Sequence, residues 1–244
     1  MVTAVSSRDV SRVEVDGTHH HDPKRPGGRT FSSQFLTSGA GAPHAFLVED
    51  EGVTRPHFHR VDQFQVVVSG GGHIGKHVVE PISIHYTDWY TPYGPIVPKA
   101  DHLSYFTLRA HENPGMYPMP EERAEKERAT GRTVTVATEL EPGSPVTAGE
   151  DGPSLDTVIE PHADGLAAYV ARIPAGAALT VPNAAEGRGQ YHVVVNGSLV
   201  ADQAELPPLS LVFVTPDEPA PELRAGAEGA EALVLQFPAP RAEA

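Results

Sequence analysis

The chain has 244 residues, and at 26.0 kDa it suits two domains of roughly 110–120 residues each. Its 32 acidic and 18 basic residues give a formal net charge of −14, which argues against nucleic-acid binding, because that binding needs a basic surface. Cysteine is absent, and there is neither a long apolar run nor a signal-type N-terminus, so we expect a cytoplasmic protein without disulfides, cysteine-held metals or membrane contact.

The first predicted strands follow a polar N-terminal segment. Residues 1–28 contain the run His19–His21 and a Gly-Gly pair, and we interpret them as a flexible arm whose histidines have no function. Across residues 29–118, short apolar stretches alternate with Gly, Pro and Asp, a pattern typical of a β-sandwich or barrel. The 23 glycines and 24 prolines of the chain support this assignment, because so many breakers disfavour long helices.

A linker is predicted over residues 119–156. Its first part, PEERAEKERATG at 120–131, carries charge on every face and predicts one short exposed helix. A stretch rich in Glu, Pro, Gly and Ser continues the linker as loop. Apolar stretches resume over residues 157–240, which predicts a second β-domain.

The two predicted β-domains share an internal repeat. Gln63–Gly70 reads QFQVVVSG, and Gln190–Gly197 reads QYHVVVNG. A Thr-Pro pair follows each copy, at Thr91 and at Thr215, and an apolar stretch follows each pair. Because two landmarks recur in the same order, we interpret the chain as two copies of one β-module.

A metal-like pattern stands at the start of the first copy. His57 and His59 are separated by one residue, so in a strand their imidazoles project from the same face. With Gln63 four positions later, the three side chains can converge on one cation. The structural alternatives are a histidine pair on a half-exposed strand and, for Gln63, an amide that lines a pocket without touching metal.

These residues resemble the cupin superfamily. The pattern H-x-H-x3-Q-x6-G that begins at His57 is similar to the first cupin motif, with Gln63 at the usual glutamate position. The P-Y-G at 92–94 is similar to part of the second motif, but Val97 stands where a metal-binding histidine is expected. The resemblance implies an all-β bicupin, with two cupin-type double-stranded β-helix (jelly-roll) barrels joined by a linker with one short helix. It also implies a homodimer and a divalent transition metal (Fe, Mn, Ni or Zn).

The second copy lacks the metal pattern. The repeat aligns Ala184 with His57 and Glu186 with His59, so both histidine ligands are missing. We expect the C-terminal barrel to bind no metal and to serve packing or dimer contacts, with His192 as a residual polar residue.

A fourth metal ligand is sought among the remaining histidines of the first copy. His85 lies in an apolar strand shortly before the second motif and is our preferred candidate. His73, His77 and His102 are alternatives, since nothing in the sequence fixes which face they take.

Pocket residues are predicted around the same motifs. Gln65 shares strand parity with Gln63 and is expected to bind substrate, as are Trp89 and Phe106 of the aromatic-rich patch, although aromatic residues of this kind also form cores. Tyr93 is the candidate catalytic acid or base. Arg109 pairs either with a substrate carboxylate or with a surface or inter-barrel carboxylate.

Two classes of function remain open. The first is a metal-dependent cupin enzyme that acts on a small oxygenated or aromatic molecule, with the ion as Lewis acid and Tyr93 moving a proton. Because Gln63 replaces a carboxylate and Val97 replaces a histidine, isomerase, cyclase or lyase chemistry is favoured over dioxygenation. The second is a non-catalytic bicupin that binds a small acid or sugar. A nucleophilic hydrolase is disfavoured because no G-x-S-x-G occurs.

Overall fold

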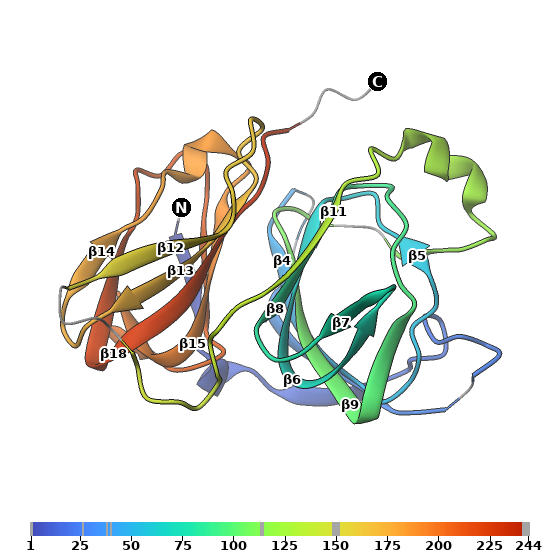
Figure 1. Cartoon of the computed structure of the whole chain (residues 1–244), viewed down its shortest axis with the longest axis horizontal. Helices are drawn as coiled ribbons and strands as arrows, with labels where there is room; N and C mark the ends of the chain where they lie inside the picture. Colours follow the sequence, from blue (N-terminus) through green and yellow to red (C-terminus); the bar gives the residue numbers. More distant parts are fainter. Residues whose placement is uncertain are drawn as a thin grey trace. The chain divides into compact units, whose positions relative to one another are not determined.

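The computed structural model describes residues 2–25, 27–37, 39, 41–112, 115–147 and 152–240, and nearly all of their regular structure is strand (Figure 1). The strands are β1 (Val2–Val5), β2 (Arg12–Val15), β3 (Thr30–Leu36), β4 (His44–Asp50), β5 (His57–Phe58), β6 (Gln63–Ile74), β7 (His77–Val79), β8 (Ser83–Thr87), β9 (Ile96–Arg109), β10 (Tyr117–Pro118), β11 (Thr133–Ala137), β12 (Ser154–Ile159), β13 (Ala167–Ile173), β14 (Ala178–Thr180), β15 (Gln190–Ala201), β16 (Ala204–Leu206), β17 (Leu211–Val214) and β18 (Glu222–Gln236). The described helices are the short 3-10 turns η1 (Ser7–Asp9), η2 (Arg123–Arg128) and η3 (Ala184–Glu186), and none of them is long and apolar enough to cross a membrane.

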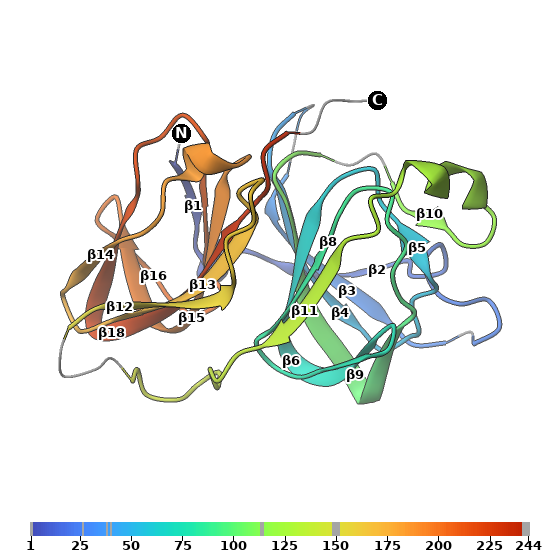
Figure 2. The ribbon, with the colours of Figure 1, turned by 45° about the horizontal axis from the view of Figure 1, so that its top comes forward.

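The chain divides into two units, each built on one antiparallel sheet. The N-terminal unit, Ser11–Glu141, has the strand order β11-β8-β6-β9-β4-β3-β2, with β7 on β6. The C-terminal unit, Met1–Val10 with Pro142–Ala244, has the order β1-β17-β15-β18-β13-β12, with β14 on β18 and β16 on β15 (Figures 1 and 2). The predicted fold of two jelly-roll domains is confirmed, although the described hydrogen-bonded path of each sheet is open rather than a closed ring.

The central strands of the two units repeat one another residue for residue. β6 and β15 each run for 12 residues and begin at Gln63 and Gln190, an offset of 190 − 63 = 127. Both strands shift register twice against their long partner, and the shifts fall at the same offset. The irregularities lie at Val67/Ser69 and Gly70/Gly72 in β6 and at Val194/Asn196 and Gly197/Leu199 in β15.

A turn before the next strand repeats as well. Ile82 has a φ of 62° and donates its N–H to the Val67 carbonyl at 2.7 Å. Leu209, 127 residues later, has a φ of 66° and donates to the Val194 carbonyl at 2.8 Å. A β-branched or bulky residue rarely adopts a left-handed backbone conformation. The same conformation with the same hydrogen bond at equivalent positions therefore supports the internal repeat.

The first 28 residues differ from the flexible arm that we expected. β1 pairs with β17, with Val2 opposite Val214, and β2 pairs with β3, with Arg12 opposite Ser33. Both are the outermost strands of their sheets, and every residue of β2 is exposed. Their polar composition is therefore that of exposed edge strands.

The expected linker also contributes to both sheets. β11 pairs with β8 along its whole length, from Thr133 opposite Thr87 to Ala137 opposite Ser83, and β12 pairs with β13. The helix expected within 120–131 is the six-residue 3-10 turn η2. β11 is the outermost strand beside β8, and β1 is the outermost strand beside β17, so the two take equivalent places in their sheets (Figure 2). In the chain, however, β11 follows the first copy, whereas β1 precedes the second.

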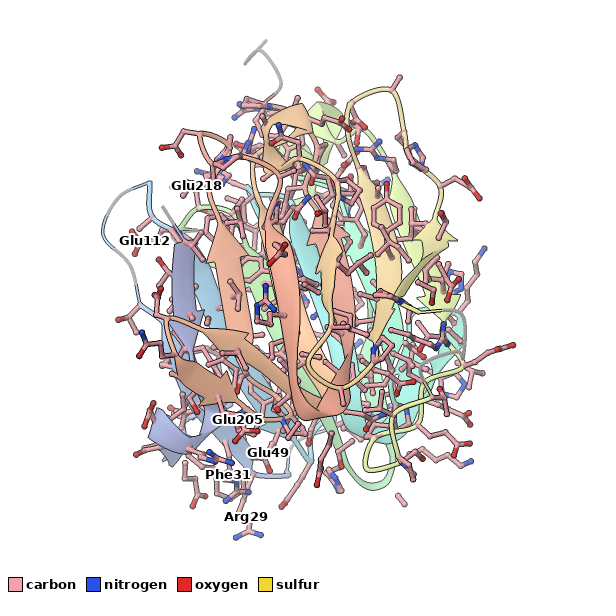
Figure 3. All side chains as sticks on the ribbon, turned by 90° about the vertical axis from the view of Figure 1, so that its left-hand side faces the viewer. Arg29, Phe31, Glu49, Glu112, Glu205 and Glu218 are labelled. Atoms are coloured by element: carbon pink, nitrogen blue, oxygen red, sulfur yellow. The ribbon has the colours of Figure 1, made fainter. Side chains whose placement is uncertain are left out.

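Charged side chains cover the β2 edge of the N-terminal sheet. The Arg12 guanidinium lies 3.4 Å from the centre of the Phe31 ring, and its Nε donates to Glu49 at 2.7 Å. Arg29 lies on the same ring at 5.3 Å, and Figure 3 labels Arg29, Phe31 and Glu49. The Phe31 ring lies on β3, next to the edge strand β2, and the charged groups that cover it discourage pairing of this edge with other chains.

The close approach of the strands at Gly197 predicts a large cost for adding a side chain. A Cβ at Gly197 (φ +64°) would lie 2.2 Å from the Gly229 carbonyl oxygen, whereas one at Gly176 (φ +68°) meets no atom within 4 Å. We expect Gly176→Ala to lower the free energy of unfolding by about 1 kcal/mol, the cost of the backbone conformation alone. Gly197→Ala should cost roughly 3 kcal/mol, because the paired strand must also move. Urea unfolding of the two variants measures the difference, and equal losses would contradict the close approach.

Candidate functional site

A cavity of about 210 Å³ opens inside the N-terminal unit. Its walls come from β3, β4, β6 and β9, from β5, and from the segment that precedes β3. The polar residues that line it and carry the argument below are His20, His57, His59, Gln65, Tyr93, Tyr105, Thr107 and Arg109. The predicted residues His57, His59, Gln65 and Tyr93 thus lie on one cavity.

Strand alternation decides which residues of β9 reach the cavity. Tyr105, Thr107 and Arg109 line it, whereas Phe106 and Leu108 are fully buried on the other face. Phe106 packs edge-on against Phe35, with ring centres 5.1 Å apart, so its predicted role in substrate binding is corrected to a core role.

Trp89 is the second correction. It is not among the residues that line the cavity; its backbone N–H donates to Asp62 at 3.0 Å, and its ring packs edge-on against Tyr90 at 5.5 Å. The aromatic-rich patch is therefore divided: Tyr93 and Tyr105 line the cavity, whereas Trp89 and Phe106 do not.

A directed chain of hydrogen bonds joins the buried groups of the site. Arg109 Nε can only donate, so it takes the amide oxygen of Gln63, at 3.2 Å. The Gln63 amide nitrogen then donates to the Tyr93 hydroxyl at 2.6 Å. Tyr93 in turn donates to His57 Nε2 at 2.7 Å, because His57 Nδ1 carries the proton that bonds the Arg55 carbonyl at 2.7 Å. Each donor thus fixes the orientation of the next group.

His59 is held in the same way as His57. Its Nδ1 donates to the Gly115 carbonyl at 2.8 Å, which leaves the Nε2 lone pair facing the Arg109 guanidinium at 3.3 Å. The two imidazoles are nearly perpendicular, at 83°, with centres 5.0 Å apart. Both rings are therefore fixed as the tautomer in which Nδ1 carries the proton and Nε2 is unprotonated.

Burial keeps the site neutral except at Arg109. Burial lowers the pKa of His57 to about 4 and that of His59 well below its usual value, and in both cases the nearby Arg109 charge lowers the pKa further. Burial also raises the pKa of Tyr93 above its usual range, although Arg109 and the bond from Gln63 act in the opposite direction. At neutral pH both histidines are therefore unprotonated and can accept a proton, whereas the Tyr93 hydroxyl keeps its proton and can donate it.

The donor set fits a divalent cation only in part. His57 and His59 fit, since a histidine that donates Nδ1–H to a carbonyl and turns Nε2 inward is the usual arrangement of a metal ligand. The Tyr93 oxygen, beside His57, adds an oxygen donor. Gln63 does not fit, because Arg109 holds its oxygen and its NH2 group faces Tyr93.

His85 lies apart from the histidine pair. Its Nδ1 and Nε2 are 2.8 and 3.2 Å from the hydroxyls of Thr135 and Thr87, and its ring centre is 5.4 Å from that of Tyr93. It is not among the residues that line the cavity. The geometry therefore favours a structural role for His85 over the fourth-ligand role that the sequence suggested.

A second group of candidate metal ligands lies where the arm was expected. The ligand atoms of His20, His21 and Asp50 all lie within 4.8 Å of one another, a spacing that could hold a divalent ion. In the structure Asp50 already accepts hydrogen bonds from Thr30, from Thr54 and from the Gly52 N–H, and His21 Nε2 lies 2.7 Å from it. This carboxylate ties the N-terminal segment to the sheet and so places His20 on the cavity wall.

Four further cavity residues were not predicted as site residues: Thr107 was not considered, Tyr105 was counted only within the aromatic-rich patch, His20 was assigned no function, and Arg109 was left undecided. Tyr105 and Thr107 share strand parity with Arg109, and that parity is the signal that could have found them. His20 gave no signal beyond the His19–His21 run. Arg109 was weighed as an ion-pair partner, and the structure instead buries it to 5% exposure on the cavity wall.

Comparison with known proteins supports the fold. No protein-family profile matches the chain, and no curated protein matches its sequence. A candidate dioxygenase from Nostoc punctiforme is similar in structure, with a TM-score of 0.63 and 9% identity over 99% of this chain and 85% of that one. The pirin YhhW of Escherichia coli, solved in complex with nickel(II), has a TM-score of 0.54 and 13% identity over 98% and 100%. The coconut allergen cocosin has a TM-score of 0.57 and 12% identity over 98% and 85%.

These neighbours are all cupin-fold proteins, and they match nearly the whole of this chain. Together with the repeated sheets they define its class: an all-β protein with two cupin-type jelly-roll domains. The chain therefore has the bicupin fold, with its polar cavity in the N-terminal unit.

The burial of His85 predicts a pH-dependent stability. Its pKa is lowered to about 3, chiefly by burial and then by His77 and His57, so between pH 3 and 6.5 the unfolded chain binds a proton that the folded chain does not. The free energy of unfolding should therefore fall as the pH drops through this window. His85→Gln should reduce the slope by up to about 1.4 kcal/mol per pH unit. Urea unfolding at a series of pH values measures the slope, and His73→Gln, which removes an exposed imidazole from the same sheet, supplies the baseline.

Proposed function

We propose that the N-terminal unit is a metal-dependent enzyme that acts on a small, oxygenated organic anion such as an enolisable or aromatic carboxylate. The observation that carries this proposal is the histidine pair: His57 and His59 each donate Nδ1–H to a carbonyl and keep Nε2 unprotonated on a cavity wall that also carries the Arg109 charge. Isomerisation, cyclisation or elimination is favoured over dioxygenation. The ion is Fe, Mn, Ni or Zn, and the assembly is a homodimer.

Arg109 is the anchor for the anion in this proposal. Its guanidinium lies 5.4 Å from the Phe46 ring centre and is fixed by the bond from Nε to Gln63, so its position is set before a ligand arrives. A planar guanidinium recognises a carboxylate through paired, charge-assisted hydrogen bonds. Among the described residues that line the cavity, Arg109 carries the fixed charge, and it is positive.

His57 and His59 would hold the divalent ion, with substrate oxygens at its remaining positions. Such an ion polarises a carbonyl and stabilises an enolate. The carbonyl bonds at both Nδ1 atoms already orient the two rings, so little reorganisation is needed. Both rings are unprotonated at neutral pH because burial lowers their pKa values, so binding requires no loss of a proton.

Tyr93 is the proton donor of the proposed reaction. Burial holds its hydroxyl in the protonated form, and the Gln63 amide keeps the oxygen in place. When His57 Nε2 is engaged by another partner, the Tyr93 O–H loses its acceptor and can donate to a substrate atom. His20 lies on the same cavity wall, and burial lowers its pKa, so it offers a neutral imidazole to accept a proton.

The missing carboxylate ligand favours non-redox chemistry. Two neutral imidazoles leave a divalent ion with its full charge, which makes it a strong Lewis acid. They donate less electron density toward a higher-valent iron than a set with a carboxylate would. Gln63 does not restore this density, because its amide oxygen is taken by Arg109.

A second candidate function is a non-catalytic domain that binds small acids. The observation that favours it is the short distance between Arg109 and His59 Nε2, because a guanidinium repels a cation that competes for this lone pair. In this alternative Arg109, Tyr93 and the histidines bind an anion directly.

Metal analysis separates the two functions. For wild-type protein purified without an affinity tag, which would add spurious sites, we expect about one equivalent of a divalent transition metal. His57→Ala and His59→Ala should each lose it, since only two protein nitrogens hold the ion. His85→Ala should retain it, because His85 bonds to threonines instead. Elemental analysis and isothermal titration with Ni²⁺ or Mn²⁺ give the readout. A wild type without metal, together with unchanged anion binding in His57→Ala, would support the non-catalytic function.

Anion recognition can be tested with a pair of isosteric probes. We expect the wild type to bind benzoate roughly 10- to 100-fold more tightly than benzamide, because only benzoate pairs with Arg109. Arg109→Met keeps the length of the side chain and should abolish this preference, whereas Arg109→Lys should retain part of it. Isothermal titration measures both affinities, and a preference for benzoate that survives in Arg109→Met would refute the anchor role.

A further inference from the structure

We propose that the C-terminal unit contains a second binding site, for a small uncharged molecule that offers one hydrogen-bond donor, such as a phenol. The site is a cavity of about 380 Å³, and His192 lies on its wall. The described residues that give the cavity its apolar walls are Leu199, Val212, Val214 and Leu223. This inference is independent of the function proposed for the N-terminal unit.

His192 lies on the wall of this cavity and carries an unsatisfied acceptor. The Gln190 amide nitrogen donates to the Pro182 carbonyl and to the Gln236 side-chain oxygen, both at 2.6 Å, so the Gln190 oxygen faces His192. That oxygen can only accept, so His192 Nε2, at 3.0 Å, carries the ring proton. Nδ1 is left with a buried lone pair that has no hydrogen-bond partner among the described residues.

An unsatisfied buried acceptor indicates a missing partner. His192 is fully buried, and burial lowers its pKa to about 4, so it is a neutral acceptor at physiological pH. A buried polar group without a hydrogen bond costs about 1–3 kcal/mol, and a donor from a ligand would remove that cost.

The internal repeat places an equivalent group in the first cavity. His192 corresponds to Gln65, since 65 + 127 = 192, and the Gln65 side-chain oxygen is also buried without a hydrogen-bond partner in the described structure. Gln65 and His192 line the cavities of their respective units. Both copies therefore keep, on a residue that lines the cavity, a buried acceptor without a partner in the described structure.

The residues that surround His192 in the sheet are neutral where those around Gln65 are charged or polar. At the same offset, apolar or uncharged residues replace the groups that surround Gln65. The replacements are Gln236 for Arg109, Val212 for His85 and Val234 for Thr107.

Charge is confined to the rim of this cavity. Glu222 and Arg224 pair with each other there at 2.8 Å, and both are more than half exposed. Figure 3 labels Glu218, a further rim residue, at one end of the sheet. An ionised ligand would lose its hydration among valines and leucines without gaining a counter-charge, so the interior favours an uncharged ligand.

The test compares phenol with anisole, which has the same ring and no donor. We expect wild-type protein to bind phenol about 3- to 10-fold more tightly than anisole, the worth of one hydrogen bond. NMR titration of protein labelled at histidine Cε1 should show the His192 resonance moving with saturable phenol binding. His192→Leu, which keeps the cavity apolar, should bind both probes alike.

Two further variants keep the test decisive. Val212→Phe fills the cavity while retaining His192 and should lose both probes. His57→Ala alters only the first cavity and should leave the preference for phenol unchanged. The proposal is overturned if wild-type His192 does not respond to phenol, if phenol and anisole bind equally, or if the preference for phenol persists in His192→Leu. A response at His57 alone would assign phenol binding to the first cavity and would also overturn it.

Discussion

The hydrogen bond from Arg109 Nε to the Gln63 amide oxygen sets the polarity of the whole N-terminal site. Because the guanidinium has no acceptor, the amide must turn its NH2 group toward Tyr93, and Tyr93 must then donate to His57. A glutamate at the Gln63 position would accept from both neighbours and reverse the direction of the chain beyond it. A glutamate would also offset the Arg109 charge, whereas with Gln63 the site keeps that positive charge.

The same position in the C-terminal unit shows how much depends on that charge. Gln190 corresponds to Gln63, but its partner across the strands is Gln236 rather than an arginine, and the bond runs from the Gln190 nitrogen to the Gln236 oxygen. The Gln190 oxygen is then free to orient His192. The same strand register thus places a charge beside the first glutamine and a neutral amide beside the second, because the side chain at one position of the long strand differs.

Much of this fold was predictable, because strand periodicity and the repeat are patterns of residues that are close together in the sequence. The Val-rich octamers predicted β6 and β15, and the spacing of His57 and His59 predicted that they would face one cavity. The aromatic-rich patch gave a wrong prediction for Phe106, because a patch of aromatic residues does not show which face of a strand each ring takes. Phe106 lies between Tyr105 and Thr107 in the sequence but faces the opposite side of the sheet. The edge strands β1 and β2 were missed because their polar residues resemble those of a solvated arm.

What the sequence could not supply was the partner of each polar group. Arg109 and Gln63 are 46 residues apart and meet only because β6 pairs with β9. His20 reaches the cavity because the buried Asp50 anchors the neighbouring His21 across the sheet. Such long-range pairs decide tautomers and amide orientations, and through them which atoms face a ligand. An anion seated at Arg109 would lie where its charge offsets the repulsion between the guanidinium and a cation on His59, so cation and anion binding at this site should favour one another.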